Sequence, residues 1–281
     1  MRNDNLYYKE SGYVGIPGLA LMTIAGLTTS ILFGFIYAYA IFYIPFIYLN
    51  FFITLIFGAG IGLAVGKSGF LTKVRNKIVM LLFGLIFGLL AEYFGWVYWI
   101  YAASEQQLLS FNPSTVIYTM QGVAEFGAWS IFGWTPTGSA LYIIWLIEGV
   151  MIVGAAVGTT LMGIGSNPFC EKCQRWTETT VLASYLEPIV NLPEFVDALE
   201  NKRLEVLTNL ANLKPSGDNR TRVELASCES CDNAHYLTLK EVRTNINDKG
   251  EPEVEENVLV ENLVIDPATL EGLKTWTKSL S

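Results

Sequence analysis

The chain has 281 residues, of which 52% are hydrophobic, and carries a net charge of −8. Residues 1–170 balance six basic against six acidic side chains, whereas residues 171–281 hold 12 basic and 20 acidic ones. An acidic C-terminal part argues against a nucleic-acid partner, which needs a basic face, and against binding flat on anionic lipid.

The N-terminal half begins with a short polar segment and continues into a long apolar one. Residues 1–14 are polar and mixed in charge, and we expect a tail whose Tyr7, Tyr8 and Tyr13 lie at a membrane interface. Residues 11–66 contain no charged side chain, which is far longer than the apolar region of a cleavable signal peptide. The apolar stretch is therefore predicted to be a retained membrane anchor.

Two spans are predicted within this stretch. About 20 apolar residues cross the hydrocarbon core of a bilayer, so a first span is expected over about 17–40, with Pro17 in its first turn. Pro45 interrupts the apolar run and predicts a tight turn, after which the second span covers about 46–66. The alternative is a single bent, re-entrant hairpin.

Glycines at four-residue spacing mark the helix faces that we expect to pack closely. In the second span Gly58, Gly62 and Gly66 follow this spacing, which lets two helix backbones approach in lipid. Packing against neighbouring helices is the first interpretation, and a homodimer face is the alternative. The same packing role is predicted for glycines of the third and fourth spans: Gly84, Gly88, Gly154 and Gly158.

The segment 67–77 sets the predicted orientation. Four of its eleven residues are basic, and short loops rich in Lys and Arg stay on the cytoplasmic side. The third span, about 78–103, then runs outward and ends in an aromatic belt. That belt comprises Tyr93, Phe94, Trp96, Tyr98, Trp99 and Tyr101.

The next segment is expected to lie outside. Residues 112–127 begin with Asn112-Pro113, a helix-start signal, and continue with helical apolar spacing, which predicts an amphipathic helix at the outer interface. A re-entrant loop that caps a cavity is the alternative. The fourth span, about 139–164, returns the chain, so residues 15–164 are predicted to form an α-helical membrane bundle of four transmembrane helices with both termini cytoplasmic.

Residues 165–281 are predicted to form a cytosolic α+β domain. Thr177–Leu213 is expected to be mostly helical, with a break at Asn191-Leu192-Pro193. Asp266 is the expected cap of a final helix. Three strands are expected at 222–226, 235–244 and 254–265, the last two joined by a turn through Asn247-Asp248-Lys249-Gly250.

The four cysteines of the chain form two Cys-x-x-Cys pairs. They are Cys170, Cys173, Cys228 and Cys231. Four thiolates in two such turns suit tetrahedral Zn²⁺, and a site closed by four cysteines has no open position for catalysis. The arrangement resembles a zinc ribbon, which implies a structural zinc ion. It departs from that pattern because Gln174 and Asp232 stand where a glycine is usual, and because 54 residues separate the pairs.

Three alternatives concern this cluster. A redox-active dithiol is one, although nothing resembling a thioredoxin context surrounds either pair. Disulfides become the expectation if the topology is reversed. His235, the single histidine, could replace a cysteine ligand, but a supporting or plain strand role is the first interpretation.

Glu92 and Glu148 lie inside predicted spans at similar depths. An ionisable residue at membrane depth is costly and often marks function, and no Lys, Arg or His lies in any of the four spans. We expect the two glutamates either to hold a proton or cation between them or to act as neutral hydrogen-bonding groups between the third and fourth helices.

These features favour a non-enzymatic membrane protein that presents an acidic, zinc-stabilised cytosolic domain to a protein partner. A small proton or cation channel or transporter component is the alternative, and a membrane enzyme with Glu105 and Glu125 as candidate acids is a third. The whole chain resembles multi-pass bacterial inner-membrane proteins, which implies the plasma membrane. A homo-oligomer is left open.

Overall fold

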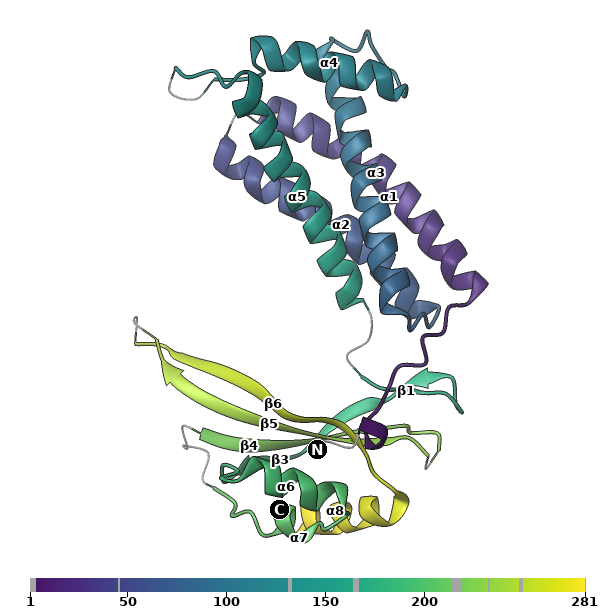
Figure 1. Cartoon of the computed structure of the whole chain (residues 1–281), viewed down its shortest axis with the longest axis vertical. Helices are drawn as coiled ribbons and strands as arrows, with labels where there is room; N and C mark the ends of the chain where they lie inside the picture. The colour runs from purple at the N-terminus through teal and green to yellow at the C-terminus, as the bar shows by residue number, and fades with distance from the viewer. Residues whose placement is uncertain are drawn as a thin grey trace. The chain divides into compact units, whose positions relative to one another are not determined.

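The computed structural model divides the chain into two compact units: Ser11–Gly165, and a second unit made of Met1–Glu10 together with Ser166–Ser281. Figure 1 traces both units along the chain. The structure describes residues 4–44, 46–130, 133–163, 167–213, 219–231, 233–247 and 250–280.

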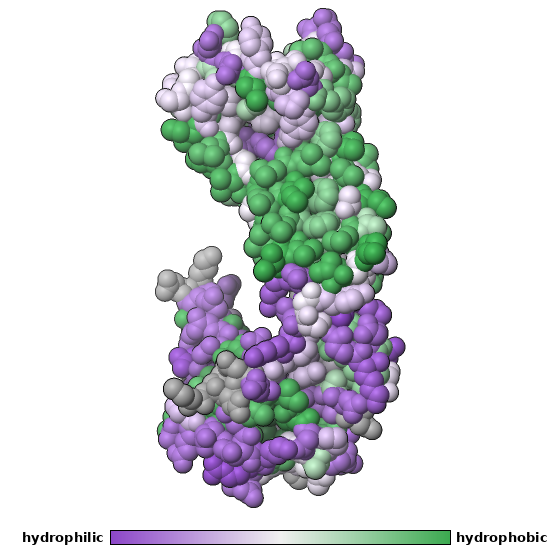
Figure 2. Space-filling view, turned by 45° about the vertical axis from the view of Figure 1, so that its right-hand side comes forward, coloured by the Kyte–Doolittle hydropathy of each residue, from purple (hydrophilic) through white to green (hydrophobic). Residues whose placement is uncertain are grey.

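Four helices of the first unit are long and apolar enough to cross a membrane. They are α1 (Ile16–Tyr43), α2 (Ile47–Leu71), α3 (Lys77–Ala103) and α5 (Gly138–Met162). At 1.5 Å per residue a helix of 25 residues is about 37 Å long, more than the roughly 30 Å of a hydrocarbon core. Because α1 and α2 have 28 and 25 residues, each is long enough to span, which favours two spans over one re-entrant hairpin. On the face drawn in Figure 2, apolar residues dominate the middle of this unit.

The glycines of α2 lie against the backbone of α5. A Cβ atom added at Gly58 would lie 2.3 Å from the carbonyl oxygen of Ile152, and one at Gly62 would lie 2.1 Å from that of Ala156. At Gly66 the nearest α5 backbone oxygen would be 2.9 Å away. Real Cβ atoms do not approach this closely, so only glycine permits the contact between α2 and α5. The internal-packing interpretation therefore accounts for these three residues.

The glycines of α3 and α5 differ in their surroundings. A Cβ at Gly84 would lie 2.9 Å from the Cα of Val157, and one at Gly88 would lie 3.2 Å from the Cα of Val153, so both lie against α5. A Cβ at Gly154 or Gly158 meets no described atom within 4 Å. The structure does not place these two at a helix contact, because they lie on the side of α5 away from α2 and α3.

The basic segment after α2 is partly built into the bundle. α2 continues past its predicted end, so Lys67 is helical. Arg75 is buried: its Nε donates to the Ser11 hydroxyl at 3.0 Å, and its guanidinium lies 4.8 Å from the centre of the Tyr13 ring. Tyr13 thus contacts a cation of its own chain.

The second unit is an antiparallel sheet with the order β3-β4-β5-β6, and helices cover one of its faces (Figure 1). Its strands are β3 (Glu178–Leu186), β4 (Asn219–Ser227), β5 (His235–Ile246) and β6 (Pro252–Val264), and its helices are α6 (Leu192–Glu200), α7 (Glu205–Thr208) and α8 (Pro267–Leu280). The core lies between sheet and helices and includes Leu186, Leu207, Leu239 and Leu273.

Several predicted local signals are present in this unit. Pro193 lies in the first turn of α6, which buries Phe195 and Leu199. Asp266 accepts a hydrogen bond from the backbone N–H of Thr269 at 2.8 Å and so caps α8. In the predicted turn, Gly250 has a φ of +77° and donates to the Asn247 carbonyl, whereas Asp248 and Lys249 lie outside the described residues.

The prediction of helix over the first part of Thr177–Leu213 is wrong, because Glu178–Leu186 forms strand β3. Its apolar residues fit a helical period as well as a strand. Pairing with β4 and the β-branched run Thr179-Thr180-Val181 favour the extended backbone.

The prediction that Tyr7 and Tyr8 belong to a polar tail and lie at a membrane interface is also wrong. Tyr7 forms an antiparallel bridge with Leu263 of β6 and belongs to the core, where it is 9% exposed. Its hydroxyl donates to Glu200 at 2.8 Å, and the backbone N–H of Tyr8 donates to the Asn262 carbonyl at 2.9 Å. The edge of β6 offers unpaired backbone groups, and these bind the N-terminal segment.

Candidate functional site

The first cysteine pair is held by a short hairpin whose two strands have two residues each. Strands β1 (Phe169–Cys170) and β2 (Arg175–Trp176) pair antiparallel, with Phe169 opposite Trp176. The intervening turn brings Cys173 back beside Cys170. The rings of Phe169 and Trp176 lie 5.0 Å apart, edge to face, and support the base of this turn.

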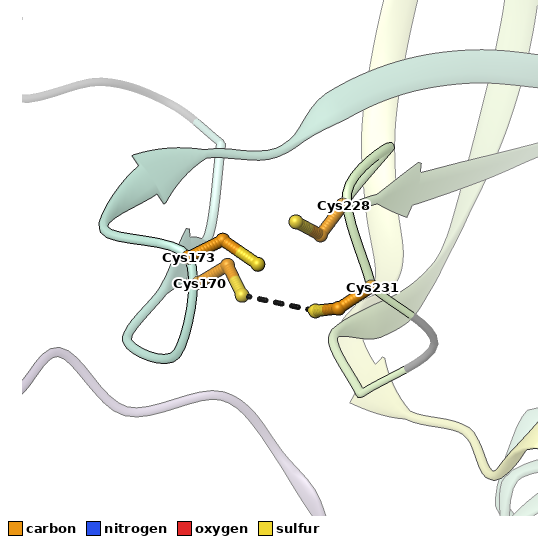
Figure 3. Close-up of side chains that lie close together, drawn as sticks. All are labelled: Cys170, Cys173, Cys228 and Cys231. Atoms are coloured by element: carbon orange, nitrogen blue, oxygen red, sulfur yellow. Dashed lines mark hydrogen bonds between the residues drawn. The ribbon is translucent and has the colours of Figure 1, made fainter.

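The second pair lies in the turn between β4 and β5. The backbone N–H of Cys228 donates to the Ala234 carbonyl at 3.0 Å, which closes the turn that contains Cys231. The first cysteine of each pair is buried and the second is partly exposed. Figure 3 shows the four side chains pointing toward one another from the two turns.

The four sulfur atoms form one compact group. All lie within 4.8 Å of one another, and the sulfurs of Cys170 and Cys231 are 3.5 Å apart. Tetrahedral Zn–S bonds of about 2.3 Å place sulfurs roughly 3.8 Å apart, whereas a disulfide requires about 2.05 Å. All four cysteines are free thiols here. The donor set and its spacing therefore fit a bound metal ion.

Three thiols of the cluster have shifted pKa values. The pKa of Cys231 is lowered to about 7, chiefly because the backbone N–H of Asn233 donates to its sulfur. Hydrogen bonding to Cys231 raises the pKa of Cys173 to about 12, and burial raises the pKa of Cys170.

Residues outside the cysteines also shape the site. Gln174 has a φ of +52°, the left-handed region that a glycine usually occupies, and its side-chain amide donates to the Glu171 carbonyl at 2.7 Å. Arg175 joins the two turns by donating to the Ser230 hydroxyl at 2.8 Å. Tyr8 accepts a hydrogen bond from the Phe169 N–H at 3.1 Å. Nothing local in the sequence connects Tyr8 with this site.

His235 is buried in β5, and the described cluster of possible metal ligands consists of the four cysteines without it. Its Nδ1 lies 3.2 Å from the Ser227 hydroxyl, across the strand pair. This position fits the first interpretation of His235, a supporting or plain strand role and not that of a metal ligand. Asp232, the other residue predicted to depart from the ribbon pattern, lies outside the described residues.

In the helical unit, Glu92 of α3 and Glu148 of α5 line a common cavity of about 70 Å³. The indole N–H of Trp96 donates to Glu92 Oε1 at 3.0 Å, and the Tyr37 hydroxyl donates to Glu148 Oε1. A Cβ at Gly149 would lie 3.9 Å from the Glu92 carboxylate, so this group reaches the residue next to Glu148. The structure brings the two predicted glutamates together.

A larger cavity of about 510 Å³ shares one wall with the first. The shared lining is Ile41, Trp99, Ala128, Trp129, Trp145 and Glu148. Ala128 and Trp129 follow α4 (Pro113–Phe126), so the described lining of both cavities includes the segment after this helix and no residue of the helix itself. The predicted amphipathic helix at 112–127 is present, and its Val116 packs against Val97 and Ile100 of α3.

The fold and the site define a protein with four helices able to span a membrane and a second unit whose four cysteines can hold a metal ion. No protein-family model, curated protein or solved structure matches the chain.

Proposed function

We propose that the chain is a non-enzymatic protein of the plasma (inner) membrane whose acidic C-terminal domain is stabilised by Zn²⁺ and binds a protein partner. The observation that carries the proposal is the closed set of four thiols. Four thiolates fill a tetrahedral zinc site and leave no position for a substrate, so such an ion serves structure. It would crosslink the turn after β1 to the turn after β4.

The proposed topology has both termini in the cytoplasm. Residues of both chain ends belong to one compact unit, which agrees with an even number of spans. The basic residues Lys67, Lys73 and Lys77 flank the junction of α2 and α3 and favour a cytoplasmic position for it. A reducing cytoplasm also keeps four free thiols available for zinc.

The proposed surface for the partner is the outer edge of β6. The sheet order leaves β6 at one edge, and the N-terminal segment binds its far end, at Asn262 and Leu263. Val254 and Val258 of this strand are 52% and 47% exposed. An unpaired edge strand with exposed valines can accept an added strand, and the surrounding acidic charge favours a basic peptide.

The zinc proposal is tested on the full chain purified in a mild detergent. We expect about one zinc per chain, and chelation should lower the unfolding temperature of the soluble unit. The double variant Cys228→Ser/Cys231→Ser should purify without metal and show no further response to chelator. Absence of metal combined with two disulfides in the mass spectrum would overturn both the zinc site and the cytoplasmic placement.

The partner proposal is tested with a photo-crosslinking amino acid in cells. Placed at Val258, it should yield one adduct, whose partner peptide is identified by mass spectrometry as an extended basic segment. Placed at the exposed Lys274 of α8, it should yield none. Adducts of equal strength at both positions would refute the β6 edge as the binding surface.

A second function is favoured by the cavity between Glu92 and Glu148. We propose that these carboxylates serve a proton or cation pathway, because both line the cavity and no Lys, Arg or His is among its described lining residues. Purified chain in liposomes should conduct protons or cations, and the variant Glu92→Gln/Glu148→Gln should lose this flux. An unchanged flux in the double variant would refute the pathway.

A further inference from the structure

The wall of the smaller cavity is largely aromatic. Half of its ten lining residues carry aromatic rings: Tyr37, Trp96, Trp99, Trp129 and Trp145. The rings of Trp96 and Trp145 are 4.7 Å apart and meet at 85°, and those of Trp96 and Trp99 meet at 69°. We call these five residues the aromatic box. The face of an aromatic ring carries negative electrostatic potential and attracts cations.

The two glutamates supply negative charge to the same box. Each accepts its described hydrogen bond through Oε1, from Trp96 or from Tyr37. Among the described side chains, none donates to Oε2 of either residue. An ionised carboxylate at this depth is costly without a counter-ion, and the described lining of the cavity contains no Lys, Arg or His that could supply one.

The larger cavity supplies room beside the charged box. It shares Glu148 with the smaller one and adds an apolar lining that includes Ile144, Ile147 and Met151. Asn50 also lines it, and the buried Oδ1 of Asn50 has no hydrogen-bond partner among described residues. The combined space therefore offers a charged end, an apolar side and one free acceptor.

This chemistry separates two kinds of cation. Metal ions such as Mg²⁺ and Ca²⁺ are held by shells of six or more oxygen ligands, whereas half of the residues that line the smaller cavity present indole or phenol rings. Aromatic boxes with a carboxylate instead bind ammonium groups that carry organic substituents, through cation–π attraction.

We infer that the cavity between Glu92 and Glu148 binds an organic ammonium ion, with its charged nitrogen among the indole rings and its substituents in the larger cavity. The inference rests on the second proposed function, for which it names the ligand class. The ammonium group has two possible sources, the headgroup of a membrane lipid and a free amine, and the test separates them.

The experiment uses the full chain in a maltoside detergent, which has no ammonium group. Tetramethylammonium chloride is titrated at constant ionic strength against sodium chloride, and binding is followed by tryptophan fluorescence and calorimetry. We expect saturable binding that sodium and potassium do not reproduce. Glu92→Gln/Glu148→Gln should weaken it at least about tenfold, as expected when a desolvated charge contact is lost.

Two matched controls make the result specific. Glu125→Gln removes an exposed carboxylate of α4, and Trp134→Leu removes an exposed indole, so both should leave the affinity unchanged. Trp145→Phe should weaken binding less than Trp145→Leu, because phenylalanine retains an aromatic face. This pair keeps the test decisive if the double glutamate variant does not fold.

The source of the ligand is decided by two further titrations. Tighter binding of a short-chain phosphatidylcholine than of free choline assigns the site to lipid, and the reverse order assigns it to a free amine. The inference is overturned if tetramethylammonium does not saturate, if sodium competes equally, or if the Glu125 control loses as much affinity. Binding without flux in liposomes would refute only the pathway, and flux without binding would refute only the ligand class.

Discussion

Replacing Tyr7 with alanine should destabilise the second unit, although this residue lies far in sequence from the sheet and helices of that unit. The ring is 9% exposed within the core, and its hydroxyl donates to Glu200. Truncating a buried aromatic side chain to alanine costs about 3–5 kcal/mol, out of a typical 5–15 kcal/mol for a whole domain. Tyr7→Phe keeps the ring and removes one hydrogen bond, so it should cost only about 1 kcal/mol.

Hydrogen exchange of the β6 backbone in the full chain measures this loss. A change of about 1.4 kcal/mol in the free energy of unfolding changes the opening equilibrium by a factor of ten. A loss of about 3 kcal/mol in Tyr7→Ala should therefore speed hydrogen exchange around Leu263 about 100-fold. Tyr13→Ala is the matched control, since Tyr13 is largely exposed and belongs to the helical unit. Equal exchange in the two variants would refute the assignment of the N-terminal segment to this sheet.

Three further predictions concern single positions. Gly62→Ala should lower the thermal stability of the helical unit in detergent by about 1–3 kcal/mol through overpacking, whereas Gly154→Ala, which meets open space, should not. Residue 174 has a positive φ, which glycine adopts without strain and a β-branched residue does not. Gln174→Gly should therefore keep or raise the unfolding temperature of the second unit, and Gln174→Val should lower it. A higher unfolding temperature for the valine variant than for the glycine variant would contradict the left-handed backbone. Hydrogen bonds from Lys202 and from the first turn of α8 lower the pKa of Asp266, so its stabilisation is full above about pH 4 and is lost as pH falls further. Asp266→Ala should therefore cost about 1 kcal/mol at pH 7, and a urea titration should show this difference shrinking in acid.

Local signals in the sequence were sufficient for the helical unit. Long runs without charge identify helices from their own composition, so the four apolar helices fall close to the predicted spans. The spacing of Gly58, Gly62 and Gly66 likewise indicated a close helix contact. It did not distinguish them from Gly154 and Gly158, because spacing alone does not state which face of a helix meets a neighbour.

The elements that were missed depend on residues distant in the chain. The strand Glu178–Leu186 is stabilised by pairing with β4, and Tyr7 is stabilised by β6 at the other end of the sequence. In the candidate site, the four cysteines were found from their motif, and the two glutamates from their depth. The aromatic wall was not, since Trp129 and Trp145 reach the cavity from separate segments.

The second unit is made of two segments that are separated in the sequence by the helical unit. This separation sets the order in which its parts are synthesised. Its first segment, up to Glu10, leaves the ribosome before any apolar helix, and its sheet follows only after α5. The N-terminal residues must therefore wait, unpaired, until the helical unit has been synthesised. A chain whose N-terminus is carried across the bilayer leaves the edge of β6 at Leu263 open and the core without Tyr7. In the proposed topology, completion of the sheet therefore requires both chain ends to lie on the same side of the membrane. A chain inserted the other way would expose apolar surface that quality-control proteases can recognise.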